Sequence, residues 1–154
     1  MPLPNFVHGF LPPRPEPYDA TLAEVKAVFC GSEERSRAWQ GFRRAHEMLT
    51  ELLPLDGCHW WLHGEFVTAA SFADQVVAQL VMPWPEDEDA FSGGQRLLLQ
   101  IATDGQSFQT ALHTRLQALR MSDESTVKRE RQRCARNRLH EGDELQDAGW
   151  VRLS

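Results

Sequence analysis

Residues 60–81 read WWLHGEFVTAASFADQVVAQLV, and this stretch decides the fold. An aromatic and aliphatic run reaches Gly64, a turn of small or polar residues follows, and Asp74 stands at the head of a second apolar run. Aromatic and β-branched residues favour strands, so we expect strands over residues 59–68 and 75–82. The segment therefore predicts two neighbouring strands, and Gly64 also fits the alternative that the first strand ends there and a turn begins.

Two helical patterns precede this segment. Thr21-Leu-Ala-Glu24 has the spacing of a capping box, which predicts a short helix that runs to about Phe29. Ser32 is placed to cap a longer helix over residues 33–53, whose apolar residues recur at three- and four-residue intervals. Pro54 ends that helix, because proline cannot continue the helical hydrogen-bond ladder.

The patterns after residue 90 are more mixed. Ser92 is placed to cap a helix over residues 95–102, and the polar segment 123–140 also favours a helix. Residues 108–116 fit either a strand or a helix, and residues 150–153 fit a short strand. This order predicts an α/β (α+β) domain, in which a small mixed sheet is flanked by helices.

Residues 1–20 differ in composition from the remainder, which we expect to form one domain over residues 21–154. Six prolines, at positions 2, 4, 12, 13, 15 and 17, fall within this segment. Proline fixes φ and removes a backbone donor, so we expect an extended N-terminal arm without a helix or a central strand.

Length and composition limit the class of protein. The 154 residues, 42% of them hydrophobic and 25% charged, suit a single globular domain and argue against disorder. The sequence has no run of about 18 apolar residues and no signal-peptide pattern, so we expect no membrane span. The three cysteines form no Cys-x-x-Cys pair, which favours reduced thiols in a cytoplasmic protein.

Charge is distributed unevenly along the chain. Residues 128–138 hold six basic residues and one acid, so the net charge of −6 leaves about −11 on the remainder. Arg129, Arg133 and Arg136 recur at helical spacing and share one face. This face could pair with phosphates, with an acidic partner or with acids of the same chain.

Two histidines in the first predicted strand invite a zinc interpretation. His59 and His63 alternate with Trp61 and fall on one strand face, together with Glu65. Residues four apart in a strand are about 13 Å from each other, which is too far for one zinc ion. We therefore expect polar residues at an edge or at a solvated face, and we expect a second set, on the other strand face, to belong to the core. That set comprises Trp60, Leu62 and Phe66.

The turn at Gly64 and the acid at Asp74 resemble the signature of polymerase-beta-type nucleotidyltransferases. In that signature a Gly-Ser turn precedes an Asp-x-Asp strand, and a later strand adds a third carboxylate. The resemblance implies phosphoryl-group transfer, in which carboxylates hold divalent ions such as Mg²⁺ that neutralise developing charge. It also implies that Gly64 and Glu65 lie beside the nucleotide and that Asp74 binds metal.

The resemblance extends along most of the chain. The proline-rich arm, TLAEVKAVF at 21–29, LHGEFVTA at 62–69 and AGWVRL at 148–153 are together similar to a family of small bacterial nucleotidyltransferase-like proteins. Relatives of this fold occur in toxin–antitoxin and phage-defence settings. The resemblance therefore implies a nucleotidyltransferase-like sheet in a bacterial protein.

Four positions depart from the family pattern. Glu65 replaces the turn serine and puts a negative charge where a triphosphate would lie. The Asp-x-Asp pair of the family is reduced to Asp74 alone, because the other position of the pair would be either Val76 or Phe72. Residues 105–122 contain no acid, and Ala148 replaces the closing lysine.

These departures favour a catalytically degenerate domain that needs no cofactor and acts by binding a protein, in an antitoxin-like or regulatory role. Trp84, between two prolines in an acidic loop, and the arginines of the basic helix are the candidate partner-binding residues. One alternative is an active nucleotidyltransferase that uses Glu65 and Asp74 with Mg²⁺. Another is a nucleic-acid-binding protein that uses the basic helix at 128–138.

Overall fold

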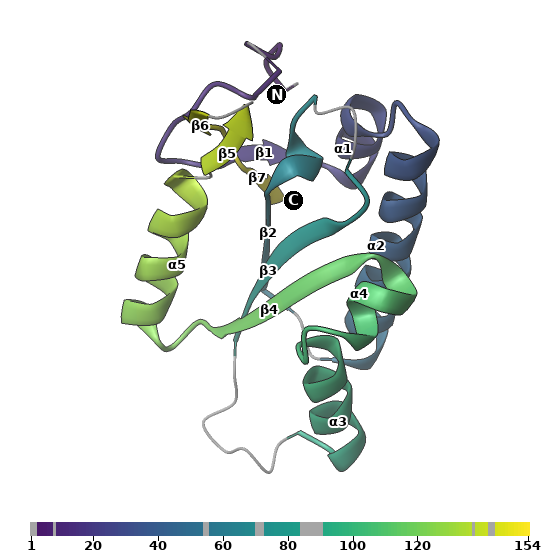
Figure 1. Ribbon diagram of the computed structural model, residues 1–154. Helices are drawn as coiled ribbons and strands as arrows, with labels where there is room; N and C mark the ends of the chain where they lie inside the picture. Colours follow the sequence, from purple (N-terminus) through teal and green to yellow (C-terminus); the bar gives the residue numbers. More distant parts are fainter. Residues whose placement is uncertain are drawn as a thin grey trace.

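A five-stranded mixed sheet forms the centre of the computed structural model (Figure 1). The residues it describes are 3–7, 9–53, 56–69, 73–83, 91–136, 138–141 and 144–154. The strands, in their order across the sheet, are β1 (Tyr18–Ala20), β7 (Val151–Leu153), β2 (His59–His63), β3 (Val76–Met82) and β4 (Thr114–Arg120). β1 with β7 and β3 with β4 are parallel pairs, whereas β2 is antiparallel to both of its neighbours. The predicted α/β class is confirmed.

The predicted β2–β3 pair is present, with Trp60 opposite Leu80 and Leu62 opposite Ala78. β2 ends at His63, however, and a 3₁₀ helix, η1 (Glu65–Val67), follows, so the predicted strand is wrong beyond residue 63. Gly64 ends the strand because its φ of 82° lies in the left-handed region that glycine adopts readily.

Five α-helices accompany the sheet. They are α1 (Leu22–Phe29), α2 (Glu33–Leu52), α3 (Gly93–Ala102), α4 (Ser107–Leu112) and α5 (Glu124–Arg136). Thr21 and Glu24 cap α1 reciprocally, and Ser32 Oγ accepts from the Arg35 amide at 3.2 Å, as the sequence predicts. Ser92 likewise forms a capping box for α3 with Gln95. The described helices include none long and apolar enough to cross a membrane.

Two segments after residue 100 differ from expectation. Residues 108–116 contain both of the predicted alternatives, because α4 ends at Leu112 and β4 begins at Thr114 after the left-handed residue His113. The helix predicted to His140 ends at Arg136, and β5 (Arg138–Glu141) pairs with β6 (Glu144–Asp147) in a separate hairpin. Neither of these two strands has the apolar alternation that identifies a strand in sequence.

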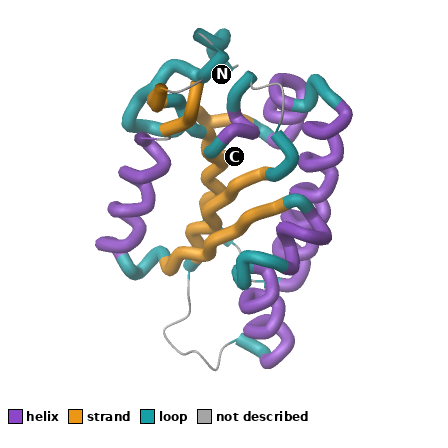
Figure 2. Tube along the Cα trace, viewed as in Figure 1, coloured by secondary structure: helices purple, strands orange, loops and turns teal. Residues whose placement is uncertain are grey.

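The helices cover the two faces of the sheet unequally. α1, α2 and α4 lie along one side and α5 lies alone on the other, as Figures 1 and 2 show. On the first side Trp60, Leu62 and Phe66 belong to the main core, as predicted. There they join Trp39 and Phe42 of α2. This side carries most of the buried apolar surface that stabilises the fold.

A smaller core lies under α5. Cys134 of α5 packs with Trp61, Val81 and Trp150, and the rings of the two tryptophans meet edge to face with centroids 5.4 Å apart. Trp61 is 5% exposed, so the prediction that the strand face of His59, Trp61 and His63 is solvated is wrong at its middle residue. α5 covers the middle of that strand face, although the strand pattern alone did not indicate a cover.

The N-terminal arm packs on the sheet instead of extending into solvent. Its last residues form the edge strand β1, and Leu11 is fully buried. The Gly149 amide donates to Leu11 O at 2.8 Å, and a Cβ at Gly149 would lie only 2.8 Å from Leu11 Cβ. Glycine at position 149 therefore lets the arm reach the segment that leads into β7.

α2 and α4 approach most closely at Gly41. A Cβ on Gly41 would lie 2.1 Å from Leu112 O, which is a backbone atom that cannot move aside as a side-chain end can. Gly41 therefore fixes the distance between the long helix and the connection that leads into β4.

We predict that Gly41→Ala destabilises the protein by about 2 kcal/mol or more, although alanine is intrinsically the better helix former by about 1 kcal/mol. The matched control is Gly94→Ala in α3, where the added Cβ meets only Ser92 Oγ at 3.8 Å. That substitution should leave stability unchanged or raise it. Urea unfolding of both variants measures the difference, and equal stability would contradict the close approach.

Candidate functional site

α5 leaves part of its sheet face uncovered, and a cavity of about 940 Å³ lies there beside Gly64. Alternation along the strands explains part of its lining, because every second residue of β2, β3 and β4 points to the α5 side. Leu116 and Ala118 of β4 and two residues after α3, Thr103 and Gly105, complete the lining at the edge of the sheet. The polar and charged side chains that line it are His63, Gln79, Thr103, Arg115, Gln117, Arg133 and Arg136. Most of this wall is therefore polar or cationic.

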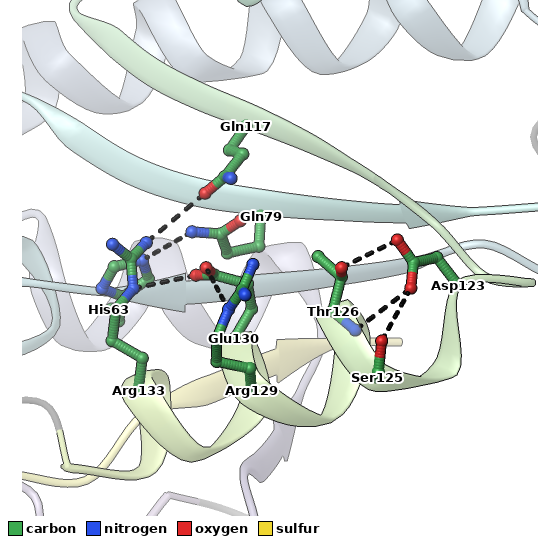
Figure 3. Close-up of polar contacts among 9 residues, drawn as sticks. All are labelled: His63, Gln79, Gln117, Asp123, Ser125, Thr126, Arg129, Glu130 and Arg133. Carbon is green, nitrogen blue, oxygen red and sulfur yellow. Dashed lines mark hydrogen bonds and ion pairs between the residues drawn. The ribbon is translucent and has the colours of Figure 1, made fainter.

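Arg133 of α5 is tied to both the helix and the sheet (Figure 3). Its Nε lies 2.8 Å from Glu130 Oε2, an ion pair that lacks the alignment of a hydrogen bond, and its Nη2 donates to Gln117 Oε1 at 3.4 Å. Glu130 is 7% exposed and also lies 4.0 Å from Arg129 Nε. The buried carboxylate thus holds Arg133 at the cavity and offsets part of its charge.

Gln79 forms the floor of the cavity. Its side chain is 2% exposed, and its Nε2 lies 3.5 Å from His63 Nε2, at the outer limit for a hydrogen bond. Gln79 Oε1 is buried and has no hydrogen-bond partner among the described residues. A buried amide with an unsatisfied oxygen is unfavourable by itself, and in native proteins such an atom calls for a partner, such as a water molecule or an ion.

His63 is neutral at physiological pH. Burial, together with the positive charges of Arg133 and Arg115, lowers its pKa to about 4. The ring therefore offers one donor and one acceptor nitrogen in place of a charge.

The turn beside the cavity is anchored from α2 by Arg35. This side chain is 5% exposed, and it donates to Phe66 O at 2.7 Å, to Phe29 O at 3.2 Å and to Glu65 O at 3.3 Å. A Cβ at Gly64 would lie 3.3 Å from Val77 Cγ2. The turn is therefore held in one conformation, with the backbone of Gly64 exposed to the cavity.

Glu65 and Asp74 do not contribute to this cavity. Both side chains are exposed, and the described residues that line the cavity include Gly64 but neither acid. Val76, the position of a second acid after Asp74, is fully buried in the main core, and Phe72 lies outside the described residues. Across the described chain, no three His, Cys, Asp or Glu side chains come close enough to hold a metal ion.

The basic helix contributes unevenly to the site. Arg133 and Arg136 line the cavity, whereas the Arg129 side chain is 73% exposed beside Glu130. Trp84 lies outside the described residues, so its predicted role in partner binding stays a prediction.

Sequence reasoning did not identify Gln79, Arg115 or Gln117. Gln79 carried a signal, since it is the one polar side chain in the apolar run from Val76 to Met82. Arg115 could not be oriented, because residues 108–116 fitted a helix and a strand equally well, and Gln117 lies just beyond that segment. With these residues the cavity has guanidinium groups on two sides and a neutral polar floor, a chemistry that suits binding an anion.

The fold and the site together define a class: a mixed α/β domain whose half-covered sheet face carries an arginine-lined cavity. The chain belongs to DUF6932, a family of unknown function whose profile matches residues 4–144. No curated protein and no solved structure matches the sequence.

We predict that His63 makes stability depend on pH. Its pKa is about 4 in the folded protein against an ordinary 6.5, so the unfolded chain binds more protons between these values and stability falls as pH drops through this window. The loss should reach roughly 2–3 kcal/mol. Urea unfolding between about pH 7 and pH 4 measures this loss of stability. His63→Gln should flatten the profile of stability against pH.

The control for this measurement is His59→Gln. His59 begins the same strand with an exposed side chain, so its replacement should leave the profile of the native chain unchanged. An equally steep profile in His63→Gln would contradict the burial of a neutral imidazole.

Proposed function

We propose that this chain is a nucleotidyltransferase-like domain that has lost catalysis and works by binding. One observation carries the proposal: the cavity beside Gly64 is lined by Arg115, Arg133 and Arg136, while Glu65 and Asp74 remain outside it on the surface. Metal-assisted nucleotidyl transfer depends on carboxylates that hold ions against the triphosphate. Guanidinium groups repel such ions and attract anions directly.

We propose a protein as the main partner, in an antitoxin-like or regulatory role within a bacterial defence or toxin–antitoxin system in the cytoplasm. Exposed apolar side chains support a protein contact. Leu97 and Ile101 are 55% and 38% exposed and share one face of α3. Leu52 is 54% exposed and lies near the start of that helix, because Gln95 Nε2 donates to Leu52 O at 2.9 Å. Exposed apolar clusters of this kind are common at protein interfaces.

Internal pairing on the basic helix favours this proposal over nucleic-acid binding. Arg133 and Arg129 both lie against Glu130 of the same helix, which reduces the charge that they could offer to a phosphate backbone.

We predict that the purified protein transfers no nucleotidyl group from labelled nucleoside triphosphates with Mg²⁺ or Mn²⁺. Calorimetry should detect no metal-dependent nucleotide binding, and Asp74→Ala should behave as the native chain does. Glu34→Ala removes an equally exposed acid from α2 and is the matched control. Metal-dependent binding that Asp74→Ala abolishes and Glu34→Ala preserves would establish the enzyme alternative instead.

We predict that a protein co-purifies with the chain from its native host and that Leu97→Asp with Ile101→Asp releases it. A charge at the centre of an apolar contact weakens association by about 100-fold or more. Val28→Asp, on an apolar residue of α1 that is 40% exposed, controls for the added charge. A monomer without a stable partner, or equal loss in the control, would count against the proposal.

A further inference from the structure

We propose that the cavity beside Gly64 binds a phosphorylated polyol, such as a sugar phosphate, without a metal ion. The inference deepens the proposed function by naming the ligand of that site. It rests on two features of the wall, which are cationic groups from two different elements and an unsatisfied amide at the floor.

The cationic groups suit a phosphate ester better than a carboxylate. Arg115 comes from β4, whereas Arg133 and Arg136 come from α5, so guanidinium groups approach the cavity from two elements. A terminal phosphate has three oxygens and about two negative charges, and it can therefore accept hydrogen bonds from both directions. Among the described residues Arg115 and Arg136 have no ion-pair partner, and only Glu130 offsets the charge of Arg133.

The floor indicates what the remainder of the ligand carries. Gln79 is 2% exposed and lacks a partner for Oε1 among the described residues. Rotating the amide exchanges its oxygen and nitrogen, so one polar atom stays unsatisfied in either orientation beside His63. A hydroxyl group can donate or accept, and it therefore completes either arrangement.

The size of the cavity agrees with a small molecule. About 940 Å³ lies near the upper end of the range of roughly 300–1,000 Å³ for small-molecule sites. A buried glutamine and a neutral histidine at its floor suit a ligand that enters deeply instead of one that contacts only the rim. Gln117 stands opposite Gln79 in the β3–β4 pair, and Figure 3 shows the contacts of Arg133 with Gln117 and of Gln79 with His63.

Calorimetry on the full chain in the presence of EDTA tests the proposal, with inorganic phosphate, glycerol phosphate and glycerol as probes. We expect saturable binding of both phosphates, with glycerol phosphate tighter by about two- to tenfold, which corresponds to one added hydrogen bond. Arg115→Gln should weaken both phosphates by about tenfold or more. Gln79→Met keeps the side-chain shape, and it should abolish the preference for glycerol phosphate while inorganic phosphate still binds.

The matched control is Arg37→Gln, which removes an exposed arginine from α2 that pairs with Glu33 at 3.3 Å. It should bind both phosphates as the native chain does. Absence of saturable binding, equal effects of Arg115→Gln and Arg37→Gln, or a preference that survives Gln79→Met would each overturn the proposal. The assay contains no metal and measures no turnover. A failure to bind phosphates would therefore overturn the proposed ligand, whereas a discovery of nucleotidyl transfer would overturn only the proposed loss of catalysis.

Discussion

Both faces of the central sheet carry apolar side chains that must be shielded from water. The helices cover one face fully and the other only in part. α1, α2 and α4 cover the first face completely enough to bury Trp60 and Leu62. On the second face a single helix, α5, shields Trp61 and Val81 and leaves the neighbouring strand positions open. The residues at those open positions are polar, as burial energetics require, and they form the cavity.

Much of the fold follows from local signals. Reciprocal caps at Thr21 and Ser92 and helical periodicity over residues 33–53 act within a few residues, so the sequence alone places those helices. The β5–β6 hairpin escaped prediction, because its strands lack apolar alternation and form through pairing with each other. The strand expected over residues 59–68 was too long. A single backbone conformation at Gly64 outweighs the strand preference of the residues after it.

The site was less accessible to sequence reasoning than the fold. The charge run identified Arg133 and Arg136, but Arg115 and Gln79 reach the same cavity only because β3 and β4 pair in parallel and in a fixed register. That register is a long-range property, and one residue of slip would turn these side chains to the other face. The resemblance to nucleotidyltransferases directed attention to Glu65 and Asp74, whose exposed side chains lie outside the cavity.

The position of β7 between β1 and β2 also bears on how the chain is made. Tyr18 pairs with Val151, so the proline-rich arm emerges from the ribosome long before its partner strand exists. Until residues 151–153 appear, β2 has an open edge and Leu11 has no Gly149 segment to pack against. The sheet therefore closes only after residues 151–153 have been made, when this strand inserts between two segments that were made earlier.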